Sequence, residues 1–470
     1  MKKRGLWGIL WVGVVLAVVA WLVGGDSHRP WVNQVLASRT DAIDEADQAR
    51  QSAARDPSLL VAVTLSGGGA RAAAFGYGVL RELQDTNFEW NGQRTDLLDA
   101  VDVVGGVSGG SITAAYFAAF GAEGLRDFER DFLYRNFQNS LILQALRPTN
   151  LYRLTSPWFG RSHLLAQRLD ELLQGRTFGD VMRRHRHPQL LISATDMAQG
   201  AGFEFTAEQF ELLCSDLRSV PLSFAVAASS SVPVLLSPMT LRNHSQECRK
   251  NGIAQRIPFA QGTGYRARLY ELQQRSYLDG AARPYVHLVD GSVADNLGVR
   301  PLLDRALAGR GVGEGFREVR LEPGRVRRLV LITVNAERDP NERVDERDEL
   351  PSSLEVFDAL RFGAGSHATH ETQEFLADIA RQWGETLQGQ AGGQEIFTSD
   401  ARIHVVQVNL RDAPADAQGR AALMRIPTAF SVQPGEVAHL VEAGRSVLRR
   451  SAAFQALRSD LHATPPPVVR

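Results

Sequence analysis

The sequence predicts an α/β fold built on a largely parallel sheet. Strand-like apolar runs alternate with helical segments, and two of these runs end in glycine-rich turns that lead straight into a helix. Such alternation is typical of parallel sheets, because each helix carries the chain back to the edge where the next strand starts. The chain has 470 residues, of which 44% are hydrophobic, so it has enough apolar material for one large core.

The charge of the chain is balanced, with 52 Lys and Arg residues against 53 Asp and Glu residues. Nucleic-acid binders usually carry a basic excess on their binding domain, so this class is disfavoured. The basic run Arg183–His187 is interpreted as solvated surface. We expect no cofactor, metal or calcium dependence, because the sequence has no complete metal-binding motif and no acidic loop of the EF-hand type.

An apolar N-terminal segment predicts a membrane anchor over residues 1–25. Lys2, Lys3 and Arg4 precede twenty uncharged residues, Leu6–Gly25, which can span the ~30 Å hydrocarbon core of a bilayer. The positive-inside rule then puts the rest of the chain outside the cytoplasm, on the periplasmic side. A cleaved signal peptide is the alternative, because Val18–Ala20 offers small residues for cleavage.

Three further regions follow the predicted anchor. Residues 26–57 are polar and predict a linker, residues 58–455 predict the α/β domain, and residues 456–470 predict a flexible tail. Within the domain, the irregular stretch 126–188 is either a cap over the site or ordinary helical packing.

The elements of the domain are predicted from their apolar spacing, in chain order. The first strand ends in glycine at residue 67, and a helix follows it directly. The other predicted elements are a strand in 97–110, a helix over 111–121, a strand pair in 189–206, a small-residue helix in 222–238, strands in 286–298, 326–337 and 401–410, and a C-terminal helix in 431–454.

The two cysteines, Cys214 and Cys248, are candidates for a disulfide. Disulfides persist in oxidising compartments, so the predicted topology favours pairing. A bridge closing a loop of this length would add about 3–4 kcal/mol in the chain-entropy model. Two unpaired buried thiols are the alternative.

Ser108 is the candidate nucleophile. It stands in Gly106-Val107-Ser108-Gly109-Gly110, a G-x-S-x-G motif between a predicted strand and a predicted helix. Glycine two residues to either side relieves crowding on the sharp turn that exposes such a serine. The helix then places its positive N-terminal end where negative charge develops. A plain glycine-rich turn is the alternative.

A glycine run earlier in the chain can supply oxyanion donors. Gly67, Gly68 and Gly69 have no Cβ, so their N–H groups can approach a tetrahedral intermediate closely. Arg71 would either fix this loop or add positive potential. A phosphate-binding turn is disfavoured, because the spacing fits neither G-x-x-x-x-G-K-[ST] nor G-x-G-x-x-G.

The base is harder to assign, because serine is a weak nucleophile without one. Asp290 follows a predicted strand and precedes a glycine, but Asp279 forms a second Asp-Gly pair eleven residues earlier. His287, or the pair His367 and His370, could also be proposed, although the pair lacks the third ligand and the spacing of a metal site.

Taken in order, these motifs resemble those of the patatin-like phospholipase family. The resemblance rests on Gly67-Gly68-Gly69-Ala70-Arg71, on the motif around Ser108, and on Asp290-Gly291-Ser292, and it extends over about residues 60–337. Two positions depart from the family pattern, Ala72 after Arg71 and Ser292 where glycine or alanine is usual. Asp279-Gly280-Ala281 fits the family's D-G-A letters better, yet the residues after Asp290 match the family's continuation.

The resemblance implies a three-layer α/β/α domain and a serine lipid acyl hydrolase with a Ser–Asp dyad. Ser108 would attack an ester carbonyl, Asp290 would be the general base, and the glycine loop would hold the oxyanion. The expected partners are a membrane and a phospholipid or lysophospholipid substrate. Two alternatives stay open: a catalytically silent lipid-binding or scaffold protein of the cell envelope, and an acyltransferase that uses the same acyl-enzyme. The sequence does not define the oligomeric state.

Overall fold

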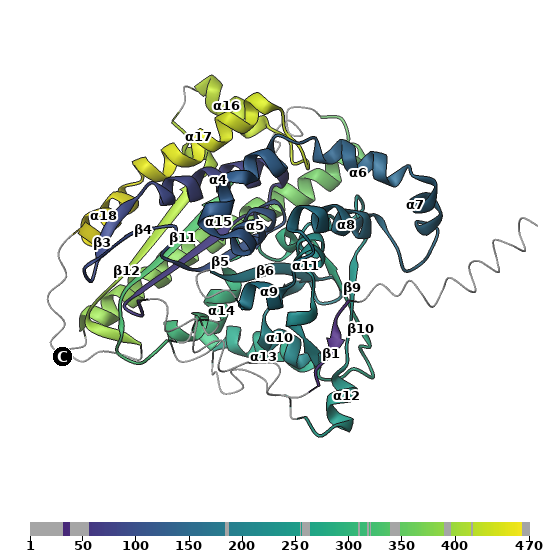
Figure 1. Cartoon of the computed structure of the whole chain (residues 1–470), viewed down its shortest axis with the longest axis horizontal. Coiled ribbons are helices and arrows are strands. Elements are labelled where there is room, and N and C mark those ends of the chain that lie inside the picture. Colours follow the sequence, from purple (N-terminus) through teal and green to yellow (C-terminus); the bar gives the residue numbers. More distant parts are fainter. Residues whose placement is uncertain are drawn as a thin grey trace, which may run out of the picture.

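The apolar runs predicted as strands form a mixed sheet of eight strands in the computed structural model (Figure 1). The structure describes residues 32–37, 56–183, 188–253, 255, 264–308, 311–316, 319, 321–338, 348–389, 396–414 and 417–462. The strands along the sheet are β12 (Phe397–Asn409), β11 (Val326–Asn335), β2 (Leu59–Leu65), β5 (Val101–Val107), β6 (Gln189–Asp196), β10 (Tyr285–Val289) and β9 (Met239–Arg242), and β7 (Ala201–Glu204) pairs with β6.

The sheet is parallel in one half and antiparallel in the other. The strands from β12 to β6 all run parallel, whereas β10 is antiparallel to both β6 and β9, and β7 is antiparallel to β6. The prediction of a largely parallel sheet therefore holds for the half that contains β2 and β5. In this half β2, β5 and β11 are buried along their whole length, as strands covered on both faces are, whereas the edge strand β12 is partly exposed.

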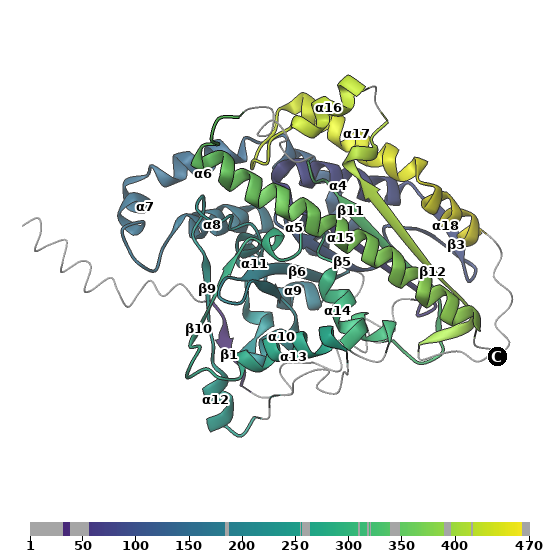
Figure 2. The same cartoon turned by 180° about the vertical axis from the view of Figure 1, so that it is seen from behind.

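Helices cover both faces of the sheet, which gives the three layers that the resemblance implied. One core joins β2, β5 and β11 to α4, α5, α11 and α17, while a second core on the opposite face joins the same strands to α14 and α15. Figure 2 shows the long helix α15 lying across the sheet. The helices are α4 (Gly69–Gln84), α5 (Gly109–Gly124), α6 (Phe137–Ala145), α7 (Pro148–Arg153), α8 (Arg161–Leu173), α9 (Phe178–Met182), α10 (Ala207–Leu212), α11 (Leu222–Ser229), α12 (Ser245–Lys250), α13 (Tyr265–Tyr277), α14 (Arg300–Ala308), α15 (Ser353–Gly389), α16 (Ala417–Arg425), α17 (Pro434–Arg450) and α18 (Ala452–His462).

The domain boundaries differ from the predicted ones at both ends. The predicted anchor, residues 1–25, lies outside the described residues, and none of the described helices is long and apolar enough to cross a bilayer. Within the predicted linker, β1 (Gln34–Val35) pairs with β8 (Ser215–Asp216), so this part of it lies against the domain. The predicted flexible tail begins too early, because α18 continues to His462 and buries Leu457 and Leu461 against the core.

The irregular stretch 126–188 forms short helices that are only partly integrated into the core. Helix α8 packs against α11 and buries Leu165 and Leu169, which is ordinary helical packing. Helices α6 and α7 instead lie at the edge of the molecule in both views (Figures 1 and 2). A small hairpin, β3 (Asn87–Trp90) with β4 (Gln93–Asp96), completes the described strands.

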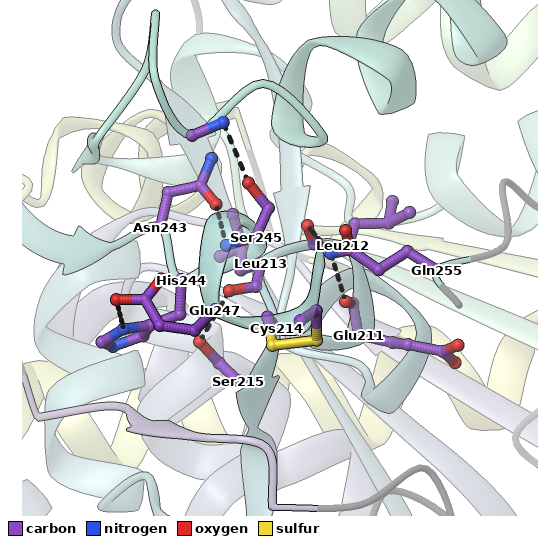
Figure 3. The surroundings of a disulfide bond; sticks show 12 residues. Glu211, Leu212, Leu213, Cys214, Ser215, Asn243, His244, Ser245, Glu247 and Gln255 are labelled. Atoms are coloured by element: carbon purple, nitrogen blue, oxygen red, sulfur yellow. Dashed lines mark hydrogen bonds and ion pairs between the residues drawn. A yellow bond between two sulfur atoms is a disulfide. The ribbon is translucent and has the colours of Figure 1, made fainter. Parts of the chain in front are cut away.

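Cys214 and Cys248 form a disulfide that ties the start of β8 to α12 (Figure 3). Both cysteines are fully buried, and Leu36 packs against them next to β1. The Leu36 N–H donates to the Cys214 carbonyl at 2.9 Å. The bridge therefore fastens two distant segments of the chain, and the segment that contains Leu36 packs against it.

Candidate active site

Ser108 occupies a strained turn between β5 and α5. Its backbone has φ 49° and ψ −120°, a conformation that residues other than glycine seldom adopt. The flanking glycines make this turn sterically feasible. A Cβ on Gly106 would lie 2.6 Å from the Ser111 Cα, and a Cβ on Gly110 would lie 2.3 Å from the Leu65 carbonyl oxygen. The G-x-S-x-G spacing therefore has the steric reason that the sequence suggested.

Asp290 lies at the end of β10 and faces Ser108. The Ser108 hydroxyl donates to Asp290 Oδ2 at 2.9 Å. The other carboxylate oxygen, Oδ1, accepts from the Ser292 N–H at 2.9 Å and from the Ser292 hydroxyl at 2.6 Å. The Asp290 residue is fully buried, and Ser108 is 6% exposed. The departure from the family pattern at Ser292 thus adds a donor that orients the carboxylate.

Strand β6 brings Ser108 and Asp290 together. In its register, Val107 at the end of β5 lies opposite Ser193, and Val289 at the end of β10 lies opposite Thr195. The two strands approach β6 from its two sides, so the residues that follow them meet beside Ser193 and Thr195. The Thr195 hydroxyl also donates to the Asp290 carbonyl at 2.9 Å and fixes the turn after β10.

The glycine loop between β2 and α4 lies beside this pair. The Gly67 N–H donates to the Asn296 carbonyl at 3.1 Å, in the turn that follows Asp290. The Gly68 and Gly69 N–H groups form no hydrogen bond with other residues that the structure describes. A Cβ on Gly109 would lie 2.0 Å from the Gly69 carbonyl oxygen, so the starts of α4 and α5 touch.

Arg71, in the first turn of α4, is buried, and its guanidinium is hydrogen-bonded within the protein. Its Nε donates to the Ala336 carbonyl at 3.0 Å, and its guanidinium also donates to the Ile426 carbonyl and to Thr428 Oγ1. Burial lowers the pKa of Arg71 to about 10, so it stays charged at neutral pH. These hydrogen bonds tie the start of α4 to the segments that contain Ala336 and Ile426.

Two serines that support the site were not predicted from the sequence: Ser229, the last residue of α11, and Ser231, two residues after it. The Ser229 hydroxyl accepts from the Ser108 N–H at 2.8 Å and donates to the Ser193 carbonyl at 2.7 Å. The Ser231 carbonyl accepts from the Asp290 N–H at 2.9 Å. The run of three serines, Ser229–Ser231, inside an otherwise apolar stretch was the available signal.

The competing candidates lie elsewhere. Asp279 is exposed, and its carboxylate accepts from the N–H groups of Ala281 and Ala282 in its own turn. His287 is exposed on β10, and its Nδ1 is 3.0 Å from Thr240 Oγ1. His367 and His370 are exposed on α15. Over the described ranges, no group of three or more His, Cys, Asp or Glu side chains is arranged to hold a metal ion.

Comparison with known proteins places the chain in a family. Human GIVD cytosolic phospholipase A2 is 13% identical, with a TM-score of 0.47, 92% of this chain covered and 68% of that chain. VipD from Legionella pneumophila is 12% identical, with a TM-score of 0.33, 85% of this chain covered and 66% of that chain. No curated protein sequence matches. The family model for patatin-like phospholipases matches residues 63–303, which is more than half of the 470 residues and contains both Ser108 and Asp290. The chain therefore belongs to the patatin-like phospholipase family of lipid-hydrolysing enzymes.

Proposed function

We propose that the chain is a serine lipid acyl hydrolase in which Ser108 is the nucleophile and Asp290 the general base. The observation that carries the proposal is the 2.9 Å hydrogen bond from Ser108 Oγ to Asp290 Oδ2, made by two buried side chains on a strained strand–helix turn. A general base must lie within hydrogen-bond reach of the proton that it removes, and this distance meets that condition. Asp290 thereby takes the role that histidine has in Ser-His-Asp enzymes.

The reaction would proceed through an acyl-enzyme. Ser108 Oγ attacks the ester carbonyl carbon of a phospholipid or lysophospholipid while its proton moves to Asp290 Oδ2. The tetrahedral intermediate collapses, the C–O bond to the alcohol breaks, and Asp290 returns the proton to the leaving oxygen. Water then attacks the acyl-enzyme with Asp290 again as base, which releases the fatty acid and regenerates Ser108.

The charge on the tetrahedral oxygen requires hydrogen-bond donors that are already in place. The N–H groups of Gly68 and Gly69 are our candidates, because they have no partner among the described residues and lie where α4 meets α5. The Gly109 N–H, directly after the nucleophile, is a third candidate at the positive end of α5. Arg71 holds the loop that carries the first two donors.

The test is hydrolysis of a p-nitrophenyl acyl ester by Ser108→Ala and Asp290→Ala. Both variants should lose at least about 10³-fold in kcat, since each removes a group that takes part in the transition state. Retention of the parent rate by both variants, at equal folded concentration, would overturn the proposal.

A fluorophosphonate probe separates this proposal from a silent lipid-binding protein. The probe should label the parent chain with a stoichiometry near one, and peptide mapping should find the label on Ser108. An unlabelled but folded chain would favour the silent alternative. Acyl transfer is distinguished by adding an alcohol acceptor and measuring whether the transferred product exceeds the free fatty acid.

We also propose that residues 1–25 anchor the enzyme in a membrane, with the described domain on the periplasmic side. The proposal rests on the three basic residues before the apolar segment and is consistent with the disulfide, which an oxidising compartment favours. Fusions of alkaline phosphatase and of a fluorescent protein to the C-terminus test it. Phosphatase activity supports the proposal, whereas fluorescence without phosphatase activity contradicts it.

A further inference from the structure

The edge helices α6 and α7 present an apolar surface that the proposed chemistry does not use. Residues 132–169, all of which the structure describes, carry exposed large apolar side chains on these helices and in the loop that follows. They include Ile142, Leu143, Leu146, Leu151, Tyr152 and Trp158. Exposed large apolar side chains that are concentrated in one segment usually mark an interaction site.

A second exposed apolar tip adjoins these helices. Val234 and Leu235, in the loop between α11 and β9, are 74% and 59% exposed. Val234 also has a φ of 70°, which is strained for a β-branched residue. The Arg161 side chain donates to the Val234 carbonyl at 2.8 Å, and Arg153 of α7 stacks on Phe159 at 3.9 Å. The first contact joins the tip to the start of α8, and the second joins α7 to the loop before α8. We call the combined surface, residues 134–161 with 234 and 235, the α6–α7 face.

The positive charge of this segment indicates what kind of surface it binds. Between Asp131 and Asp170 the sequence has five arginines, namely Arg135, Arg147, Arg153, Arg161 and Arg168, and no Asp or Glu, although the whole chain has a formal net charge of −1. Arg135, Arg147 and Arg161 are exposed. Apolar side chains flanked by arginine suit the surface of a bilayer that contains anionic lipid.

The α6–α7 face is connected to the candidate dyad. The Ser231 carbonyl accepts from the Asp290 N–H at 2.9 Å, and the Ser231 hydroxyl donates to Ser162 Oγ, at the start of α8, at 2.8 Å. Val234 follows Ser231 by three residues, which places its Cα within about 10 Å of the Ser231 Cα. A bilayer in contact with Val234 would therefore lie near the dyad.

We propose that the α6–α7 face docks on the surface of an anionic phospholipid bilayer and holds the dyad next to its substrate. The role of this docking in catalysis rests on the proposed function. The contact between the face and the bilayer can be measured without any hydrolysis. The leucines and Trp158 enter the headgroup region, and the arginines contact lipid phosphates.

The contact is tested with a fluorophore at defined positions on the full chain. The two native cysteines form the disulfide, so Leu143→Cys, Val234→Cys or Leu272→Cys supplies the one thiol for a polarity-sensitive label. Leu272, on α13, is 68% exposed, against 67% for Leu143, and α13 lies away from α6 and α7 in both views (Figures 1 and 2). The chain is reconstituted into vesicles of phosphatidylcholine alone or of equimolar phosphatidylcholine and phosphatidylglycerol.

The emission at positions 143 and 234 should shift to shorter wavelength in the vesicles with phosphatidylglycerol, and the emission at position 272 should not shift. The absence of a shift at 143 and 234, or an equal shift at 272, overturns the proposal. A shift without lipid that grows with protein concentration also overturns it, because the face would then bind a second copy of the chain.

The consequence for turnover is tested with a matched pair of double variants. Leu143→Ser with Leu146→Ser should lower hydrolysis of vesicle phospholipid about tenfold. Leu269→Ser with Leu272→Ser, which alters side chains of similar exposure on α13, should change it less than twofold. Arg147→Gln should lower it about fivefold, and only on vesicles with phosphatidylglycerol.

Hydrolysis of soluble p-nitrophenyl butyrate should stay within twofold of the parent in all three variants. Equal losses on the soluble ester and on vesicles would assign the α6–α7 face a structural role and overturn the proposal. A parent chain without activity on either substrate would contradict the proposed function, while the fluorescence shifts would still decide the docking.

Discussion

Strand β10 has an Asp-Gly pair on each side: Asp279-Gly280 comes before it and Asp290-Gly291 after it. The two pairs form hydrogen bonds with different parts of the chain. The Asp279 carboxylate accepts only from N–H groups of its own turn among the bonds described above, and the Gly280 N–H donates to Ser245 Oγ. Asp290 is bonded to Ser108, Thr195 and Ser231, which come from three other elements. The strand between the two turns spans about 15 Å, so one nucleophile cannot serve both.

This difference shows what makes an Asp-Gly pair a candidate for catalysis. The two pairs share their letters, and Asp279 even fits the family's D-G-A pattern better. Asp290 differs from Asp279 because it is buried and because it contacts Ser108, which is far away in the sequence. Both features depend on the register of β5 and β10 along β6. The carboxylate in the turn at Asp290-Gly291, the inner turn, is therefore bonded to a residue from a distant part of the chain. The carboxylate in the turn at Asp279-Gly280, the outer turn, is bonded within its own turn. The following predictions test that contrast.

The largest effect is expected from the two aspartates themselves. Asp290→Asn should lower kcat on a soluble ester by at least about 10³-fold, because the amide cannot accept the Ser108 proton. Asp279→Asn should change kcat less than twofold, since its carboxylate only caps an exposed turn. Steady-state kinetics on both variants at equal folded concentration is the measurement. A comparable loss from Asp279→Asn would remove the distinction between the turns.

The α/β fold and the contact between Ser108 and Asp290 were easier to predict from the sequence than the residues that support this contact. Strand–turn–helix patterning around Gly106 and Ser108 is local, so it can be recognised in the sequence. The occupied Gly67 N–H and the role of Ser229 could not be predicted, because each depends on a partner more than a hundred residues away. Arg71 is similar, since its partners Ala336 and Ile426 lie outside the family-matched range 63–303.

A smaller effect is expected from the arginine that fixes the glycine loop. Arg71→Lys should lower kcat about 10²-fold, because one ammonium group cannot donate at once to the Ala336 and Ile426 carbonyls and the donor loop loses its position. Arg283→Lys is the matched control beside the outer turn, where Arg283 donates to Asp196 and Ser276. The control should lose stability in thermal denaturation and keep kcat within threefold. Equal kcat losses in the two variants would mean that general destabilisation explains both.

A still smaller effect is expected from the serines that form hydrogen bonds with the two turns, Ser292 at the inner turn and Ser245 at the outer turn. Ser292→Ala removes one of two donors to Asp290 Oδ1, and we expect kcat to fall about tenfold with KM unchanged, since a hydrogen bond to a charged group contributes about 1.5–3 kcal/mol. Ser245→Ala removes the acceptor for the Gly280 N–H and should leave kcat unchanged. A loss in kcat/KM through KM alone would show that Ser292 contacts substrate and does not orient the carboxylate.

The smallest effect on turnover is expected where the chain is most strongly cross-linked. The disulfide joins Cys214 to Cys248 of α12, the helix that begins at Ser245 (Figure 3), and the Ser245 hydroxyl accepts from the Gly280 N–H of the outer turn. Replacing both cysteines by serine should lower the free energy of unfolding by about 3–4 kcal/mol, because the unfolded chain loses a closed loop. The contacts of Ser108 and Asp290 come from other elements, so kcat per folded molecule at 25 °C should stay within twofold. Denaturant titration and kinetics on the same preparation measure both quantities, and a tenfold fall in kcat without unfolding would show that the two ends of β10 are coupled after all.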